Sequence, residues 1–192
     1  TEQGIWKAFV DRSDDDGKTW NKSQEVEISQ LEYKSGERTV GKDDSSIPVS
    51  EQSFYGRGVI QPTLWESIPD QVHMLLRSTE GMIYRSDSKD GGDTWTEAYA
   101  TELPNNNSGI DMIRSKDGKL FLVYNPVGVN WGDRTPISLA VSKDDGKTWE
   151  KIRDLSTGEG EFAYPAIIQD EDFLYITYTY KRKNIAFWKI RK

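Results

Sequence analysis

The sequence predicts an all-β protein built from repeated four-stranded antiparallel sheets. The main observation is a pattern, Ser-x-Asp-x-Gly-x-Thr-Trp, that occurs three times in 192 residues, at positions 13–20, 88–95 and 142–149. A motif that recurs in this way indicates an architecture of structural repeats. Aromatic residues make up 11% of the chain. Together with short apolar stretches between Gly- and Asp-rich turns, they are typical of strands joined by hairpins.

Each copy of the pattern has the chemistry of a hairpin loop. An Asp carboxylate accepts hydrogen bonds from backbone N–H groups of its own turn, and Gly adopts a positive φ without steric cost. The following Thr-Trp begins the outgoing strand, with an indole that can fold back over the turn. A calcium loop of the EF-hand type would need oxygen ligands at positions 1, 3 and 5 and Gly at position 6. Counting back from Gly17 places Arg12 first, and from Gly146 places Val141 first, so we expect a structural hairpin and no metal site.

Strands are expected on both sides of each repeat. The predicted order is two strands (5–11, 20–28), then four (59–65, 71–77, 82–87, 95–100), four (110–114, 119–125, 137–141, 149–155) and three (164–169, 173–180, 184–190). Alternation in 71–77 places His73 and Arg77 on one face and Met74 on the other. Pro62 inside its strand implies an edge or a bulge. The polar stretch 30–54 is expected to be a long excursion or an irregular strand pair.

These strands amount to a little over three blades of a β-propeller. Propellers are radial repeats of four-stranded sheets, typically four to eight of them. An open fan would leave sheet edges uncovered. We therefore expect residues 1–192 to form a partial propeller of about three to four blades, completed by the same polypeptide or by another chain. The start at Thr1 rather than Met leaves open whether an upstream segment was removed.

Composition argues against several classes of function. The net charge is −7, whereas a nucleic-acid-binding protein is expected to carry a basic surface. No run approaches 18 apolar residues, so no membrane span is expected. Cys is absent, which excludes a disulfide framework and thiol chemistry. No signal-peptide pattern occurs at the N-terminus, and both a secreted and a cytoplasmic location stay open.

The repeated pattern resembles the Asp-box, or bacterial neuraminidase repeat, found on propeller hairpins of sialidases, other glycan-active enzymes and some sorting receptors. From about Gly56 to the end, the chain is also similar to the sialidase-like BNR-repeat proteins of bacteria and plants. The stretches that carry this similarity are Gln61-Pro62-Thr63, Arg77-Ser78, 103–111, Tyr124-Asn125-Pro126, Arg134, 161–165 and 178–182. The resemblance implies a six-bladed propeller of the sialidase type, of which this chain covers about half. It also implies that the Asp-boxes lie away from the catalytic face.

The resemblance further implies a set of site residues. Sialidases cleave terminal sialic acid, whose carboxylate is bound by three Arg, because a planar guanidinium matches a carboxylate with two hydrogen bonds. A Tyr, activated by a Glu, is the nucleophile, and an Asp serves as acid/base. In the second half of the family's fold the order is Glu, Arg, Arg, Tyr. By this order Arg77 and Arg134 would bind the substrate and Tyr164 would be the nucleophile.

The chain departs from the family at two places. Gln61 stands where the family has its Glu, and an amide cannot act as a base; it is retained as a substrate-binding candidate. Glu161, close to Tyr164 in sequence, and Asp111 are the candidate replacements, while Asn107 is a further candidate substrate contact. The family's first Arg and its acid/base Asp belong to the other half of the fold, and no residue here matches them.

Three hypotheses about function follow. The first is a retaining, metal-free and cofactor-free sialidase-like glycoside hydrolase, for which Arg77, Arg134 and Tyr164 must converge; the chain alone is expected to be inactive. The second is a non-catalytic propeller that binds glycans or proteins, which Gln61 favours. The third is a polysaccharide lyase acting on uronic-acid polymers, for which His73 must lie beside Tyr164. In the first and third hypotheses the partner is a glycan or oligosaccharide.

Overall fold

The computed structural model describes residues 5–28 and 57–192, and every regular element in these ranges is a β-strand. The all-β prediction is therefore confirmed, while the predicted excursion 30–54 lies outside the described residues. The strands are β1 (Ile5–Trp6), β2 (Asp11–Arg12), β3 (Asn21–Lys22), β4 (Arg57–Ile68), β5 (Gln71–Ser78), β6 (Met82–Ser88), β7 (Tyr99–Pro104), β8 (Asp111–Arg114), β9 (Leu120–Tyr124), β10 (Ile137–Ser142), β11 (Glu150–Ser156), β12 (Phe162–Gln169), β13 (Phe173–Tyr180) and β14 (Asn184–Arg191).

The strands pair in the predicted groups. Sheets with the order β4-β5-β6-β7, β11-β10-β9-β8 and β12-β13-β14 follow one another along the chain, and β2 pairs with β3. The neighbours within these sheets are antiparallel. The predicted strand 5–11 is interrupted: β1 joins β4 in parallel, whereas Ala8 bridges Val26 and β2 pairs with β3. One stretch therefore connects two sheets.

The last strand of the first complete sheet differs from its prediction. The structure begins β7 at Tyr99 rather than at Trp95. The backbone N–H of Thr96 donates to the carbonyl of Asp87, and that of Ala98 donates to the carbonyl of Glu27 in the preceding sheet. These contacts hold the chain between two sheets until it joins the ladder with β6.

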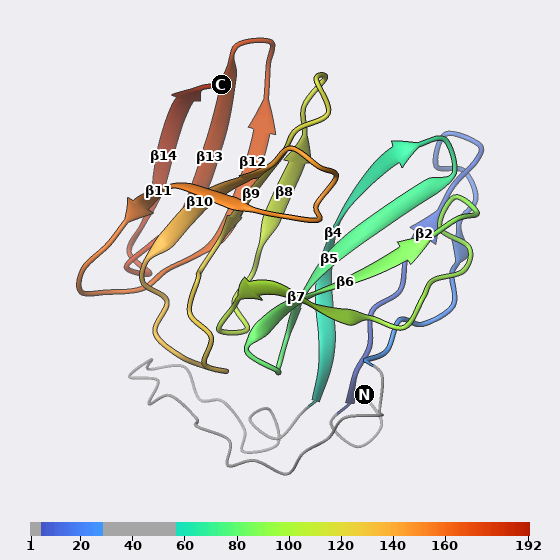
Figure 1. Cartoon of the computed structure of the whole chain (residues 1–192), viewed down its shortest axis with the longest axis horizontal. Helices are drawn as coiled ribbons and strands as arrows, with labels where there is room; N and C mark the ends of the chain where they lie inside the picture. Colours follow the sequence, from blue (N-terminus) through green and yellow to red (C-terminus); the bar gives the residue numbers. More distant parts are fainter. Residues whose placement is uncertain (1–4, 29–56) are drawn as a thin grey trace.

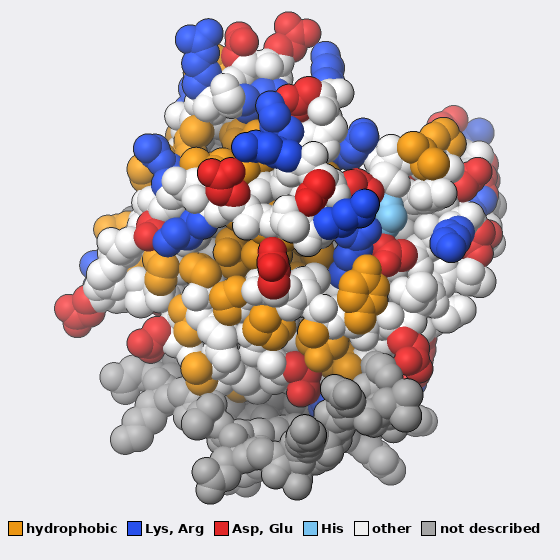
Figure 2. Space-filling view, viewed as in Figure 1, with side chains coloured by type: hydrophobic (Ala, Val, Ile, Leu, Met, Phe, Trp, Pro, Cys, Tyr) orange, Lys and Arg blue, Asp and Glu red, His pale blue; other side chains and the backbone are white. Residues whose placement is uncertain are grey.

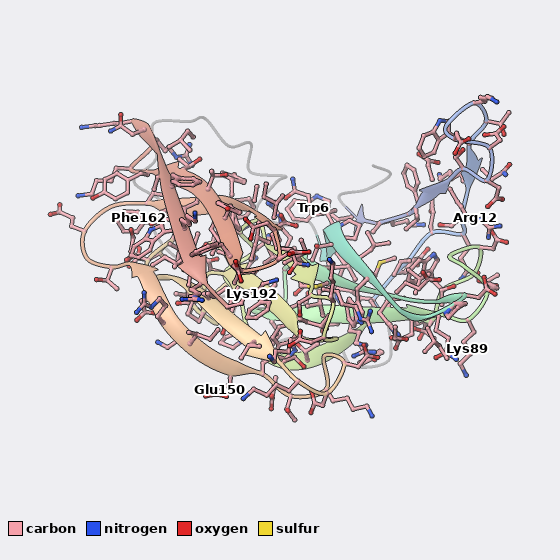
Figure 3. The ribbon with its side chains drawn as sticks, turned by 90° about the horizontal axis from the view of Figure 1, so that it is seen from above. Trp6, Arg12, Lys89, Glu150, Phe162 and Lys192 are labelled. Carbon is pink, nitrogen blue, oxygen red and sulfur yellow. The ribbon has the colours of Figure 1, made fainter. Side chains whose placement is uncertain are left out.

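The sheets stand side by side like the blades of a fan (Figure 1) and are seen from above in Figure 3. Their first strands are adjacent, since β8 contacts both β4 and β12. Apolar side chains fill each space between neighbouring sheets. The cluster between the sheets that contain β9 and β12 includes Phe121, Leu139, Phe162, Ile167 and Ile176. The cluster between those that contain β5 and β9 includes Trp65, Leu75, Ile83, Leu103 and Leu122.

Because of the alternation predicted for residues 71–77, β5 contributes apolar side chains to the clusters on both of its faces. Leu75 packs toward the sheet that contains β9, while Met74 and Leu76 pack on the opposite face against Val26. Because successive side chains of a strand point to opposite faces, one apolar strand contributes to the core on both sides. On the outer surface, acidic and basic side chains are interspersed over the described part of the face in Figure 2.

The three Asp-boxes form hairpin turns with the same contacts of their Ser and Asp side chains. In the third, the Ser142 hydroxyl accepts a hydrogen bond from the Gly146 N–H at 2.9 Å. The Asp144 carboxylate accepts from the Thr148 N–H at 2.9 Å and from its hydroxyl at 2.6 Å. Hydrogen bonds from the Thr hydroxyl and N–H lower the pKa of Asp144 from 3.8 to about 2. The turn chemistry predicted from the sequence is therefore present.

Antiparallel pairing places the Asp-boxes at one end of the sheets, together with the short connections 69–70, 115–119 and 170–172, and the other loops at the opposite end. The second and third Asp-boxes join the third and fourth strands of their sheets, and the first joins β2 to β3. In the sheets that contain the second and third Asp-boxes, the second and third strands are joined at the other end. We call this other end the loop end; it consists of residues 79–81, 105–110, 125–136, 157–161 and 181–183. It lies at the lower side of the sheets in Figure 1.

Candidate functional site

Two site candidates lie in equivalent distortions of the first strands. Gln61 in β4 and Tyr164 in β12 have φ values of 51° and 54°, and each is followed by Pro. The pairing register shifts at both places, between Ile60 and Thr63 and between Ala163 and Ala166. A bulge redirects side chains, and a non-Gly residue in this region of φ is strained, which is a common feature of functional sites. The bulge predicted at Pro62 is thus present.

Arg77, near the end of β5, reaches the same place. Its Nη1 donates to Gln61 Oε1 at 2.7 Å, and its guanidinium lies 5.8 Å from the centre of the Trp6 ring. The side chain is buried, and this burial lowers the pKa of Arg77. The interaction with Tyr164 opposes that shift, whereas the charge of Arg134 adds to it. Arg77, Arg134 and Tyr164 are therefore close enough to act on one another.

Arg134 enters from the connection between β9 and β10. Its guanidinium lies 5.0 Å from the centre of the Tyr164 ring, and its Nη1 forms an ion pair with Glu161 Oε1 at 2.7 Å. The second Glu161 oxygen binds Arg182 Nε at 2.6 Å. The Arg134 carbonyl also accepts from the Phe162 N–H at 2.8 Å, at the start of β12. Because both Glu161 oxygens contact guanidinium groups, the geometry fits a role in positioning Arg134.

A buried polar network holds the loop that carries Arg134. The Ser108 hydroxyl contacts the side-chain oxygens of Asn106 at 2.5 Å and Asn125 at 2.6 Å. The Asn106 amide then donates to the carbonyls of residues 132 and 133 at 3.0 and 2.7 Å. The Asn125 amide donates to the Phe162 carbonyl at 2.9 Å. This network fixes the loop relative to β12, so these residues position the site.

Asn107, a candidate substrate contact, is buried at the loop end. Its amide nitrogen donates to Asn130 Oδ1 at 3.1 Å, and its φ is 62°. Its Oδ1, and both polar side-chain atoms of Asn105, are buried without a hydrogen-bond partner among the described residues. Buried amides of this kind normally require a partner. The geometry shows Asn107 as part of the loop's support.

Asp111 joins the three first strands. Its Oδ1 accepts from the Thr63 hydroxyl at 3.1 Å and the Met112 N–H at 2.9 Å, while its Oδ2 accepts from the Ile167 N–H at 2.9 Å. These donors belong to β4, β8 and β12. Both oxygens are thus used inside the fold, which favours a structural role over the catalytic one considered from the sequence.

His73 lies in a separate cluster. Its Nε2 is 2.8 Å from the Ser67 hydroxyl, and its Nδ1 is 2.5 Å from Asp87 Oδ1. Asp145, in the third Asp-box, is 3.6 Å from Nε2 and accepts from Trp65 Nε1 at 2.8 Å. These contacts connect two neighbouring sheets. The lyase hypothesis would require His73 to lie beside Tyr164, whereas these contacts place it in a different group of residues.

Two contributors were not assigned a role from the sequence. A Cβ on Gly109 would lie 3.2 Å from Tyr164 Cδ1 and 3.9 Å from Gln61 Oε1, so the missing side chain makes room for both. Arg182 supplies the second cation to Glu161. In the sequence, the basic run 181–183 was the only local feature that pointed to a role for Arg182. Within the described ranges, no group of three or more His, Cys, Asp or Glu is placed to hold a metal ion.

The fan of four-stranded sheets and the three Asp-box turns define a sialidase-like BNR-repeat β protein. A family model described as "BNR repeat-like domain" matches residues 1–176, and the chain belongs to this family. No curated protein matches the sequence. The described residues also contain no helix long and apolar enough to cross a membrane.

Solved structures with a similar fold include sialidases. The K499G mutant of NanB sialidase from Streptococcus pneumoniae has a TM-score of 0.61 at 16% identity, over 90% of this chain and 24% of that one. Trypanosoma rangeli sialidase gives 0.58 at 15% identity, over 88% and 24%. The α-L-arabinofuranosidase Arb93A from Fusarium graminearum gives 0.52 at 17% identity, over 69% and 45%. The chain thus shares the fold of these enzymes and spans about a quarter of the length of the sialidases.

Proposed function

We propose that this chain supplies the carboxylate-binding and nucleophile part of a sialidase-like glycoside hydrolase site for terminal sialic acid. The observation that carries the proposal is the grouping of Arg77, Arg134 and Tyr164 at the loop end. A guanidinium pair is suited to an anionic sugar, because each can donate two parallel hydrogen bonds to a carboxylate. A half-exposed Tyr beside that pair is suited to attack the neighbouring anomeric carbon.

The chemical step would divide between these residues. Arg77 and Arg134 hold the carboxylate and so fix the orientation of the sugar. The Tyr164 hydroxyl oxygen forms a bond to the anomeric carbon while the bond to the leaving oxygen breaks. The phenolic proton is lost and the leaving oxygen gains a proton, both through an acid/base group outside residues 1–192, and water later hydrolyses the glycosyl–Tyr bond. A structure of Trypanosoma rangeli sialidase with 2,3-difluorosialic acid is described as a covalent intermediate, which supports a covalent route for a sialidase of this fold.

Gln61 is the residue that argues most strongly against hydrolysis at this site. Its amide accepts a hydrogen bond from Arg77 and can orient that guanidinium, but it cannot take the proton of Tyr164. Glu161 has both oxygens on guanidinium groups. These two observations favour a second candidate function, a propeller that binds acidic glycans without cleaving them. Both functions use the same carboxylate site.

The decisive experiment measures fluorophore release from an aryl sialoside by the complete gene product. Activity that is lost in Tyr164→Phe and kept in Tyr180→Phe supports the hydrolase. Tyr180 is a suitable control because it is another partly exposed Tyr of the last sheet. Full activity in Tyr164→Phe would refute the nucleophile assignment. Binding of sialyllactose without turnover would support the second candidate, and hydrolysis by the 192-residue chain alone would contradict its expected inactivity.

A further inference from the structure

An open groove lies beside Tyr164, and its lining includes neither Arg77 nor Arg134. It has a volume of about 590 Å³ and is lined by Tyr164, Thr179, Arg182, Lys183, Asn184 and Ile185. Pockets of roughly 300–1,000 Å³ are typical of sites for small ligands. Because Tyr164 belongs both to this groove and to the candidate site, a substrate held at the Arg pair can extend into it.

The charge of the groove is distinctive. Two of its lining residues are cationic and none is acidic, although the chain as a whole carries a net charge of −7. Arg182 is held by Glu161 through its Nε. Lys183 is exposed and forms no ion pair with any residue in the described part of the chain. A groove of this composition favours a ligand that is anionic at this point.

The turn that presents these cations is strained. Lys181 and Arg182 have φ values of 54° and 49°. They are the central pair of a β-turn within the three-residue loop 181–183, closed by a hydrogen bond from the Lys183 N–H to the Tyr180 carbonyl at 3.1 Å. A central pair with two positive φ angles is normally Asn-Gly or similar. Here it is held by a hydrogen bond from the Lys181 N–H to the Glu161 carbonyl at 2.7 Å. Strained residues that persist where better turn formers exist are a reason to look for function.

The two lysines of the turn point to different places. Lys183 lines the groove. The Lys181 stem lies against Gly160, where an added Cβ would be 2.9 Å from Lys181 Cγ, and its ammonium is 5.8 Å from the centre of the Tyr180 ring. The turn therefore contains a matched pair of cations, one in the groove and one outside it.

We propose that the groove beside Tyr164 is a second anion-binding subsite, in which Arg182 and Lys183 select a substrate with two successive acidic sugars. This inference rests on the proposed function. The sugar at the Arg pair would present its carboxylate to Arg77 and Arg134, and the next sugar would place its own carboxylate near Lys183. A single charge-assisted hydrogen bond is sufficient for about a tenfold preference over a ligand with one acidic sugar.

The test compares matched ligands by calorimetric titration of the complete gene product carrying Tyr164→Phe, which prevents turnover of the probes. One pair is sialyllactose and disialyllactose, and the other is galacturonic and digalacturonic acid. We expect about tenfold tighter binding of the diacidic member at low salt, with a smaller ratio at high salt. Lys183→Gln should reduce this ratio several-fold, whereas Lys181→Gln, which removes the same charge outside the groove, should preserve it. Circular dichroism checks that both variants fold.

The outcomes separate this inference from the proposed function. Equal affinity for both members of a pair that binds overturns the subsite and leaves the proposed function standing. An equal effect of Lys181→Gln and Lys183→Gln also overturns it, because the preference would then reflect overall charge. Preference for digalacturonic acid without any binding of sialosides supports the subsite and refutes the sialic acid assignment. Absence of binding by all four probes overturns both.

Discussion

Substitution of Asp111 tests whether this carboxylate joins the sheets or takes part in catalysis. Its Oδ1 accepts two hydrogen bonds and its Oδ2 accepts one from the Ile167 N–H. In Asp111→Asn the amide oxygen would keep the position with two donors, so the amide NH₂ would face the Ile167 N–H. One hydrogen bond to a charged group is lost, and a half-buried donor loses its acceptor, which together cost about 2–3 kcal/mol.

The expected effect is a lower stability with the fold retained. For a chain of this length, 1 kcal/mol corresponds to roughly 2–4 °C in Tm, so Asp111→Asn should melt about 4–12 °C lower. Urea unfolding of the 192-residue chain gives the same quantity through its midpoint. Asp133→Asn, at an exposed side chain, is the matched control and should change little. Unchanged stability of Asp111→Asn together with lost turnover in the complete gene product would refute the structural role and return Asp111 to the catalytic candidates.

Three further outcomes follow from the contacts described. Hydrogen bonds within the turns lower the pKa of the Asp-box carboxylates Asp15, Asp90 and Asp144 from 3.8 to about 2. Their stabilising contribution should be complete above about pH 4 and disappear as the pH falls toward 2, which urea midpoints measured across this range will show. Gly109→Ala should displace the Tyr164 ring by a few tenths of an ångström. Sialoside binding should then weaken several-fold at nearly constant Tm. His73→Ala should cost about 2 kcal/mol in urea unfolding, because it removes a buried ring and its hydrogen bonds to Asp87 and Ser67; an unchanged midpoint would contradict this.

The parts of the fold that the sequence predicts well are those with a local cause. Each Asp-box turn is specified by residues within one short stretch, since Ser, Asp and Thr bond to the backbone of their own turn. Strand positions between the turns follow from alternation, as in β5. The same local logic identifies the bulge at Gln61-Pro62, and it applies equally to Tyr164-Pro165.

Contacts between distant segments were beyond prediction. No local pattern indicates that Asp111 bonds to the backbone of Ile167, 56 residues further on. The split of residues 5–11 between two sheets likewise depends on where β4 lies. For the site, the resemblance identified Arg77, Arg134 and Tyr164, but Glu161 was considered as a base for Tyr164, whereas its oxygens contact Arg134 and Arg182. Sequence proximity to a nucleophile does not determine the direction of a side chain.

The two ends of the sheets differ in how their charged side chains are paired. At the Asp-box end, the Asp carboxylates accept hydrogen bonds from donors of their own turn, and these bonds stabilise the hairpin. At the loop end, Gln61, Tyr164 and Arg182 adopt positive φ values, which the local preference of non-Gly residues disfavours. There Glu161 pairs with both Arg134 and Arg182. Each of these two guanidinium groups remains beside Tyr164. Non-Gly residues with positive φ occur at both ends, at Asp16, Asp70 and Asp145 as well as at Gln61, Tyr164 and Arg182. What distinguishes the loop end is therefore the group that Arg134, Glu161 and Arg182 form beside Tyr164, in which charges pair between separate segments of the chain.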